Sequence, residues 1–335
     1  CCIGAGYVGG PTMAIIANTF TRYSAVGIRE ELSNIIYNIS PEETPFMSNG
    51  GRETVRNTFF EWQTDSLAAA STNYQIDGDD IAAFPATNPT TRIGNYTNIS
   101  RKLVILADNL EVINEAGRTS ELAYQITKLG QELKRDQETT LMANSAAVGG
   151  AAGTARQTAG LPAWLKTNSD RGTGGTDPTV SGGIVNAAAG DATAGNRRAF
   201  TLSILDAVIE SVWTQGGTPK MLMVGPHNKT VVSGFSGIAA NRYEVKKPEA
   251  GVIIGAADIY VSDFGAVNIV PNRFQRERDA YVLDPEFYAT CFLRPLEVID
   301  LAKTGDAEKR MLLVEYGLKV KNEAALGVCA DLTAS

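Results

Sequence analysis

The sequence predicts an α+β protein, because long alternating strands and one long amphipathic helix occupy separate stretches of the chain. Residues 91–101 and 312–320 alternate apolar and polar side chains, which is the period of a strand with one buried face. Residues 119–146 carry apolar side chains at helical spacing. The chain has 335 residues, of which 44% are apolar and 20% charged. It can therefore bury a sizeable core, and two domains are expected.

Residues 18–50 are expected to form an extended arm that contains one short helix. Residues 30–36 have helical spacing, and Pro41 ends that helix. The apolar side chains of the arm have no partner within it. They must therefore pack against the core or against a neighbouring subunit.

Residues 53–106 are predicted to form a long two-stranded excursion. Residues 54–63 are rich in strand-forming side chains, and residues 91–101 alternate. The connection at 68–89 is unusually long for a compact domain, which indicates a functional loop. An isolated two-stranded hairpin is only marginally stable in water, so this one is expected to lean on another chain.

The helix at 119–146 is the clearest single element. Its apolar side chains recur at steps of four, three and four, at Leu122, Ile126, Leu129 and Leu133. Thr119 or Ser120 is expected to cap its start, and the pair Gly149-Gly150 to end it. A length of about 26 residues corresponds to roughly 39 Å. The helix is therefore expected to be a spine packed on a sheet.

The second half of the chain is predicted to contain shorter elements. Residues 148–198 are rich in Gly, Ala, Thr and Asn and are expected to form loops or a small insertion. Residues 201–264 are predicted to be an α/β region whose first helix ends at Gly216-Gly217. Further elements are expected as a helix at 226–235 and as strands at 221–224, 253–254, 258–261, 266–270 and 281–283.

A single histidine, His227, excludes much catalytic chemistry. Zinc sites with two or three histidines are impossible within one chain, and a Ser-His-Asp triad would have to use His227. No G-x-S-x-G motif accompanies it, so a capping or surface role is expected. Asp77, Asp79 and Asp80 lack the spacing of a calcium-binding helix-loop-helix and are interpreted as an acidic turn. No catalytic residue and no metal site is predicted.

The formal net charge of −7 argues against sequence-independent nucleic-acid binding, which needs a basic surface. Small basic groups at 197–198, 246–247 and 273–278 are interpreted as solvated faces or subunit contacts. The four cysteines do not resemble a disulfide framework, so a reducing compartment is expected. No run has the length of a membrane span and no signal peptide is recognised, so no membrane association is expected.

Gly4, Gly6 and Gly9 form a G-x-G-x-x-G motif, which is the dinucleotide-binding fingerprint. Residues 1–17 resemble the start of nucleotide-sugar dehydrogenases of the UDP-glucose type. However, the strand that should precede the motif and the strand with an acidic end that should follow it are both lacking. Neither Cys291 nor Cys329 has the setting of that family's catalytic cysteine. We therefore interpret the motif as a decoy and predict no cofactor. Residues 1–12 are expected to be a fused, upstream or misassigned segment, with the natural start at Met13.

Two motifs near the N-terminus carry a different resemblance. NIIYNISPEETPF at 34–46 is followed by FEWQTD at 60–65. This pair resembles the start of tailed-phage major capsid proteins with the Hong Kong 97-type fold, and the resemblance extends over residues 18–335. It implies an N-terminal arm at 18–52, an extended β-hairpin loop at 53–106, a peripheral domain with the spine helix at 107–149 and 271–335, and an axial domain at 150–270. Residues 1–17, which precede these parts, are interpreted as an atypical N-terminal segment.

The resemblance implies a structural protein and not an enzyme. Copies of the chain would form hexamers and pentamers of an icosahedral shell that encloses double-stranded DNA without sequence specificity. Portal proteins and scaffold or decoration proteins would be further partners. The shell would assemble in the host cytoplasm and reside in the virion. The same fold also suits the shell of a bacterial nanocompartment, and an NAD-dependent nucleotide-sugar dehydrogenase is the third alternative.

Some relatives cross-link their subunits through a lysine of the extended loop. Here the first lysine of the chain is Lys102, and none lies at 53–101. The resemblance therefore does not carry the isopeptide bond to this chain, and stability is expected from noncovalent contacts or an accessory protein. Boiled particles should run without ladders on a denaturing gel.

Overall fold

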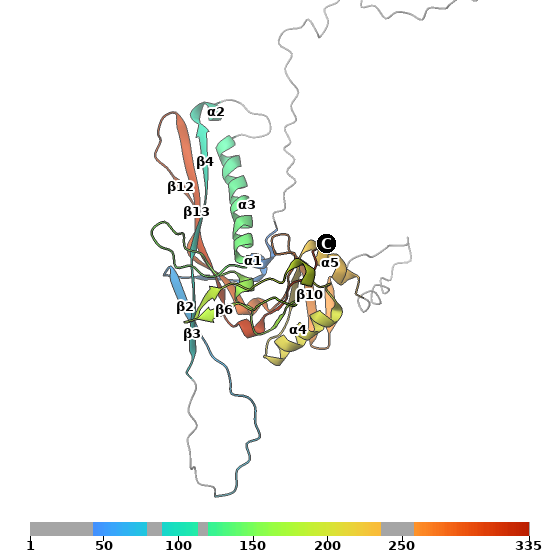
Figure 1. The fold of residues 1–335 in the computed structure, drawn as a ribbon. Coiled ribbons are helices and arrows are strands. Elements are labelled where there is room, and N and C mark those ends of the chain that lie inside the picture. Colours follow the sequence, from blue (N-terminus) through green and yellow to red (C-terminus); the bar gives the residue numbers. More distant parts are fainter. Residues whose placement is uncertain (1–42, 79–88, 113–119, 236–257, 335) are drawn as a thin grey trace, which may run out of the picture. The chain divides into compact units, whose positions relative to one another are not determined.

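In the described part of the chain, two larger sheets and two short ladders hold the strands, and helices lie against the larger sheets (Figure 1). The computed structural model describes residues 43–78, 89–112, 120–235 and 258–334. The mixture of helices and strands confirms the predicted α+β class. The arm at 18–50 lies outside the described residues up to position 42, and so do Gly4, Gly6 and Gly9.

The first sheet has four strands in the order β1-β12-β13-β4. They are β1 (Gly51–Thr54), β4 (Asn98–Ala107), β12 (Tyr288–Asp300) and β13 (Ala307–Val320). β1 runs parallel to β12, and the other two pairs are antiparallel. Two register shifts interrupt the β12–β13 ladder on either side of Arg294, an irregularity of the kind that bends a strand.

Helix α3 (Glu121–Leu141) covers one face of this sheet beside β4 and β13 (Figure 1). Lys102 of β4 forms an ion pair with Asp136 of the helix at 2.8 Å. Ser120 caps the helix, because its hydroxyl accepts a hydrogen bond from the Ala123 N–H. The spine packed on a sheet and its cap at Ser120 are therefore confirmed.

The predicted helix at 119–146 was too long at its C-terminal end. α3 stops at Leu141, before the Gly149-Gly150 pair. The chain then turns back on itself, and the Gly160 N–H donates to the Ser145 carbonyl at 3.2 Å. A Cβ atom at Gly160 would lie 1.9 Å from the Ala143 carbonyl oxygen, so only glycine permits this approach. This tertiary pairing outweighs the helix preference of the intervening residues.

The second sheet has six strands in the order β5-β14-β11-β8-β10-β9. Along the chain they are β5 (Ser169–Asp170), β8 (Met221–Val224), β9 (Ile259–Ser262), β10 (Gly265–Pro271), β11 (Ala280–Leu283) and β14 (Gly327–Cys329). Every residue of β8 and β11 is buried. The buried strand predicted at 221–224 is confirmed. The strand predicted at 253–254 lies outside the described residues.

Two helices accompany the six-stranded sheet, α4 (Leu202–Thr214) against β14 and β5 and α5 (Pro226–Ser233) against β10. Gly216 follows α4 with a φ of +91°, a left-handed conformation that favours glycine. The Gly217 N–H donates to the Val212 carbonyl at 3.0 Å and the Gly216 N–H to the Trp213 carbonyl at 2.9 Å. This is a Schellman ending, and it confirms the stop predicted at Gly216-Gly217.

The remaining elements are short. Helices α1 (Pro45–Asn49) and α2 (Asp108–Val112) have five residues each. One two-stranded ladder joins β2 (Phe59–Thr64) to β3 (Thr91–Tyr96). The other joins β6 (Thr179–Ser181) to β7 (Ile184–Ala187). Short 3-10 turns lie at Leu161–Ala163, Ala194–Asn196, Pro285–Phe287 and Glu323–Ala325.

Strand pairing narrows the predicted hairpin. The ladder spans residues 59–96, and β1 and β4 on either side of it belong to the four-stranded sheet. The strand predicted at 91–101 breaks at Thr97, where the chain passes from one sheet to the other. The prediction of a two-stranded excursion over 53–106 was therefore too wide.

The strand predicted at 312–320 was expected to have one buried face. Leu313 and Glu315 are buried as well, so this part of β13 is covered on both faces.

The core is continuous between the two larger sheets. One buried cluster includes Leu133 of α3, Tyr316 of β13, Met223 of β8 and Tyr281 of β11. A second buried cluster joins α4 to the opposite face of the six-stranded sheet. β11 and β14 pair with the strands of 150–270 although they lie within 271–335. A boundary at residue 271 therefore does not follow the sheets.

Candidate assembly surfaces and their supports

The root of the β2–β3 hairpin is fixed by a buried asparagine. Asn95 is fully buried, and its amide donates to the Leu318 carbonyl at 2.7 Å and to the Thr158 hydroxyl at 3.0 Å. Its oxygen accepts from the Ala159 N–H at 2.9 Å. One side chain thus ties the hairpin to β13 and to the segment after α3. Buried amide groups with satisfied hydrogen bonds set a specific geometry.

A buried carboxylate holds the point where the hairpin becomes β4. Glu315 is 3% exposed and accepts hydrogen bonds from the Thr97 hydroxyl at 2.8 Å, from Arg156 at 2.6 Å and from Arg294 at 3.0 Å. Arg294 lies between the two register shifts of β12. The charge is therefore paired twice, which offsets the cost of burying it. The hairpin, β12, β13 and the segment after α3 meet at this one side chain.

A second buried carboxylate anchors the end of the N-terminal arm. Glu138 of α3 is fully buried and accepts from the Phe46 N–H at 2.7 Å and the Met47 N–H at 3.0 Å. It thereby caps α1, whose first N–H groups have no partner within the helix. Asn272 donates a third hydrogen bond at 2.8 Å. Burial raises the pKa of Glu138, although these three hydrogen bonds oppose the shift.

Phe46 completes this anchor. Its ring stacks on Tyr288 of β12 with centroids 4.4 Å apart and planes at 5°. Phe46 is fully buried. Because the predicted motif at 34–46 ends here, its last aromatic residue is a core residue of this copy.

The face of the four-stranded sheet opposite α3 carries an apolar stripe. Leu103 of β4, Met311 of β13 and Ile299 of β12 lie next to one another in register. Lys102 and Leu312 alternate with them and meet α3, which places the stripe on the other face. Leu103 and Ile105 are 58% and 61% exposed. An exposed apolar stripe on a long edge strand marks an interaction surface.

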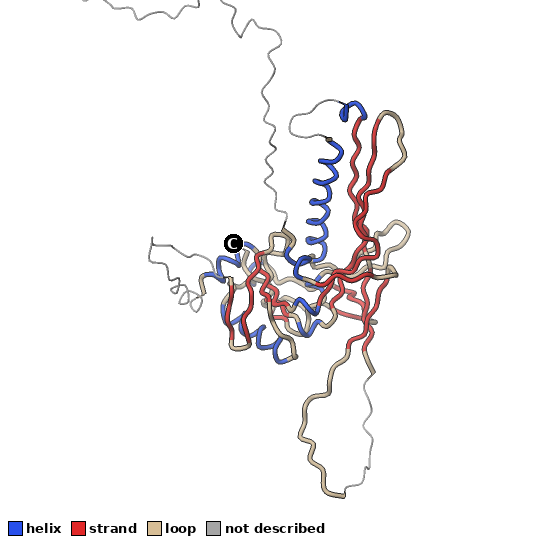
Figure 2. Tube along the Cα trace, turned by 180° about the vertical axis from the view of Figure 1, so that it is seen from behind, coloured by secondary structure: helices blue, strands red, loops and turns tan. Residues whose placement is uncertain are grey.

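The loop after β2 is the most exposed apolar segment in the described part of the chain. Leu67, Tyr74 and Ile76 are 98%, 89% and 81% exposed. Residues 65–78 have no helix or strand, and Figure 2 shows them leaving the ladder as loop. Large apolar side chains at such exposure have no burial partner within the described part of their own copy. This agrees with the expectation that the hairpin leans on another chain.

The residues considered for chemistry do not gather. His227 is the second residue of α5 and is half-buried. Asp77 is exposed, and Asp79 and Asp80 lie outside the described residues. Within the part of the chain that the structure describes, no three His, Cys, Asp or Glu side chains could hold a metal ion together. In the same ranges, no helix has the length and apolar character needed to cross a membrane.

Several residues of the predicted basic groups are paired within the chain. Arg276 and Arg278 both contact Asp191, and Arg198 contacts Asp170 at 2.7 Å. Lys246 and Lys247 lie outside the described residues. These arginines therefore contribute no free positive patch.

Sequence reasoning missed the three supports Asn95, Glu138 and Glu315. Glu138 lies within the helix predicted at 119–146. Its partners Phe46 and Met47 lie 92 and 91 positions away, and no local pattern indicates such contacts. For Asn95 and Glu315, the only available signal was their position within apolar strand patterns.

Comparison with known proteins bears on the family. The model of the SU10 major capsid protein family matches residues 15–333. The major capsid protein of Escherichia phage Phieco32 is 27% identical over 341 residues, which cover 92% of this chain and 96% of that protein. The match of the family model begins after Gly4, Gly6 and Gly9.

Solved structures share the fold at low identity. A capsid structure of Cyanophage A-1(L) has a TM-score of 0.68 at 12% identity, covering 91% of this chain and 97% of its own. A structure from Gordonia phage Cozz has a TM-score of 0.59 at 12% identity, covering 97% of this chain and 99% of its own. The SrpI encapsulin complex of Synechococcus elongatus has a TM-score of 0.52 at 11% identity, covering 90% of this chain and 93% of its own.

These likenesses confirm the fold that the motifs at 34–46 and 60–65 implied. Fold alone does not separate a phage capsid from a nanocompartment shell, because both kinds of structure match. The family model and the phage relative do separate them. The chain belongs to the SU10 major capsid protein family, so it is a structural subunit of a virus capsid and not an enzyme.

Proposed function

We propose that copies of this protein assemble into hexamers and pentamers that tile an icosahedral shell around double-stranded DNA. The observation that carries this proposal is the pair of apolar surfaces left open in a single copy. These are the stripe on β4, β12 and β13 and the exposed loop 65–78. Exposed apolar surfaces of this kind mark sites where neighbouring molecules bind.

The segments keep the roles implied by the resemblance. Residues 18–52 act as an arm, residues around the β2–β3 ladder as the extended loop, and the four-stranded sheet with α3 as the peripheral domain. The region 150–270 with β11 and β14 forms the axial domain. Asn95 and Glu315 support this division of labour, because they fix the root of the hairpin while its loop stays open for a neighbour.

Genome binding needs no basic surface in this proposal. The chain has a net charge of −7, and Arg198, Arg276 and Arg278 are paired internally. The shell therefore encloses DNA that is loaded through a portal, without sequence-specific contacts. Assembly takes place in the host cytoplasm, with scaffold or decoration proteins as further partners.

Electron microscopy of the purified full-length protein tests the proposal. We expect closed shells tens of nanometres across. The variant Leu103→Asp should remain folded and fail to form shells, because a charge in the stripe opposes its burial. Leu103→Met keeps the stripe apolar and should assemble. A protein that stays a small oligomer under all conditions, or shells formed equally by Leu103→Asp, would contradict this use of the stripe.

A further inference from the structure

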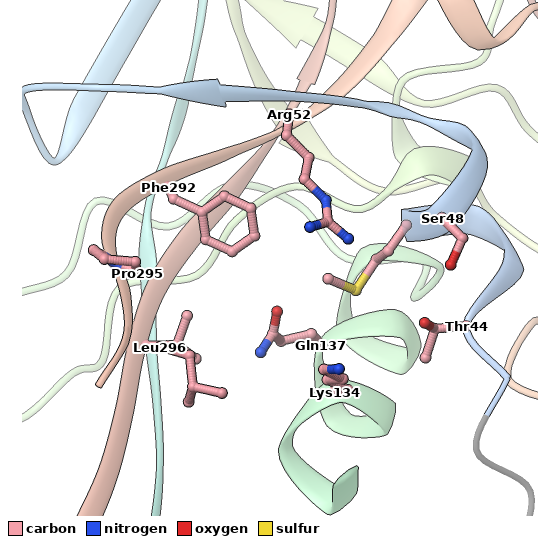
Figure 3. A pocket seen from close by; sticks show the side chains of 10 residues that line it. Thr44, Ser48, Arg52, Lys134, Gln137, Phe292, Pro295 and Leu296 are labelled. Atoms are coloured by element: carbon pink, nitrogen blue, oxygen red, sulfur yellow. The ribbon is translucent and has the colours of Figure 1, made fainter. Parts of the chain in front are cut away.

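A pocket opens between α1, α3 and β12, on the α3 side of the four-stranded sheet (Figure 3). Its volume is ≈ 360 Å³. One wall is apolar and includes Met47, Phe292 and Leu296. The other side carries polar groups, with Arg52 from β1 and Lys134 and Gln137 from α3 turned toward the space.

The charge of this pocket is one-sided. Its lining contains two cations and no acidic residue. Arg52 and Lys134 have no ion-pair partner among the residues that the structure describes, whereas Lys102 on β4 is paired with Asp136. Gln137 is 3% exposed and contributes an amide that lines the pocket. Cations held beside an apolar wall favour a ligand that presents a carboxylate next to an apolar group.

The exposed loop carries the complementary groups, an acidic side chain next to apolar ones. Ile76 is 81% exposed and is followed directly by Asp77, which is also exposed. Tyr74, two residues earlier, is 89% exposed. A peptide of this composition can place an apolar side chain on the wall and a carboxylate on the cations. Because these side chains are exposed in their own copy, they are open to a contact with another copy.

We propose that residues 74–77 of one copy dock into this pocket of a second copy. Asp77 lies between Arg52 and Lys134, and Ile76 packs against Phe292 and Leu296. Such docking buries the exposed loop side chains and places one carboxylate beside both cations of the pocket in one contact. The inference rests on the proposed assembly into a shell, and it identifies which surfaces of two copies meet.

A charge-swap series on the full chain tests the contact. Arg52→Glu and Asp77→Arg each place like charges in the contact, and each should raise the protein concentration needed for shell formation about tenfold. The double variant R52E/D77R restores opposite charges and should recover most of that loss. Sedimentation of shells over a concentration series gives the readout, and thermal unfolding of the unassembled protein should not change.

Two controls match the variants in charge and setting. Lys128→Glu reverses an exposed cation on α3 that does not line the pocket, and Asp65→Arg reverses an exposed carboxylate at the start of the same loop. Both should assemble like the unaltered protein. Equal losses in these controls would reduce the effect to net charge and overturn the contact.

The remaining outcomes are also decisive. If Arg52→Glu weakens assembly and Asp77→Arg does not, the pocket holds a different anion and the loop is not its occupant. If both single variants weaken assembly and the double variant recovers nothing, the two residues do not meet. If the unaltered protein forms no shells, the proposed function itself fails, and the contact fails with it.

Discussion

The six-stranded sheet and the four-stranded sheet differ in how much of their apolar surface is buried within one copy. The inner strands β8 and β11 of the first are buried at every residue, with buried side-chain clusters against both faces. The second sheet is covered by α3 on one face and carries exposed leucine and isoleucine on the other. The inner strands of the first sheet are covered within one copy, whereas the second sheet leaves an apolar face that neighbours cover in the proposed shell. Stability of the subunit and formation of the shell should therefore respond to different substitutions.

The largest expected effect comes from the inner strands of the six-stranded sheet. Leu222→Ala removes a fully buried side chain of β8 and should lower the free energy of unfolding by about 2–5 kcal/mol. Leu103→Ala, on the exposed stripe, should change it by less than about 0.5 kcal/mol and should weaken shell formation instead. Urea unfolding of unassembled protein, together with sedimentation of shells, measures both effects. A similar loss of folding stability in both variants would break the comparison.

The next effect concerns the junction of hairpin and sheet. Glu315→Ala leaves Arg156, Arg294 and Thr97 without their shared acceptor. Loss of one partner from a buried ion pair costs about 3–5 kcal/mol. Both guanidinium groups reach water here, at 24% and 43% side-chain exposure, so we expect about 2 kcal/mol. Limited proteolysis should also cut the hairpin sooner. Unchanged unfolding and unchanged cleavage would show that Glu315 does not hold the hairpin.

Two carboxylates should give opposite pH dependences. The pKa of Glu138 is raised by burial, so its contribution to stability is present below its ordinary pKa and is lost as pH rises through the raised value. Burial opposes ionisation of Glu53 as well. Hydrogen bonds and charge from Lys319 and Lys321 outweigh it and lower the pKa of Glu53. Its contribution is present above its ordinary pKa and is lost as pH falls through the lowered value.

Unfolding free energies across a pH series separate the two groups. The difference between the unaltered protein and Glu138→Gln should grow as pH falls toward the ordinary carboxyl pKa. The difference for Glu53→Gln should shrink as pH falls further. Parallel slopes for the two variants would contradict the assigned causes.

The smallest expected effect is in the reactivity of the two buried thiols. Burial raises the pKa of Cys291 to about 12 and raises the pKa of Cys329 well above its ordinary value. Neither should be alkylated in the folded protein at pH 8. In mild denaturant Cys291 should react first, because it is covered on one side by the four-residue edge strand β1. Peptide mapping after timed alkylation tests this order, and earlier labelling of Cys329 would reverse our ranking of the two sheets.

The sequence predicted elements whose signals are local. The strand at 221–224, the stop at Gly216-Gly217 and the cap at Ser120 each depend on a few adjacent residues. Contacts across long separations could not be predicted in this way. The hydrogen bond from Thr97 to Glu315 joins residues 218 positions apart. The order of elements in 271–335 likewise does not indicate that β11 and β14 belong to the six-stranded sheet while β12 and β13 belong to the four-stranded sheet. The predicted end of α3 was wrong for the same reason, because the hydrogen bond from the Gly160 N–H to the Ser145 carbonyl turns the chain back after Leu141.

The passage of one extended chain from β3 into β4 at Thr97 has a mechanical consequence. β3 leads directly into β4, whose ten residues pair antiparallel with β13 (Figure 1). A pull on the hairpin along the chain is therefore transmitted along β4 and loads the β4–β13 hydrogen bonds in shear, many at once, instead of opening them one after another. In a shell under pressure from within, tension between neighbouring subunits would be carried by this ladder.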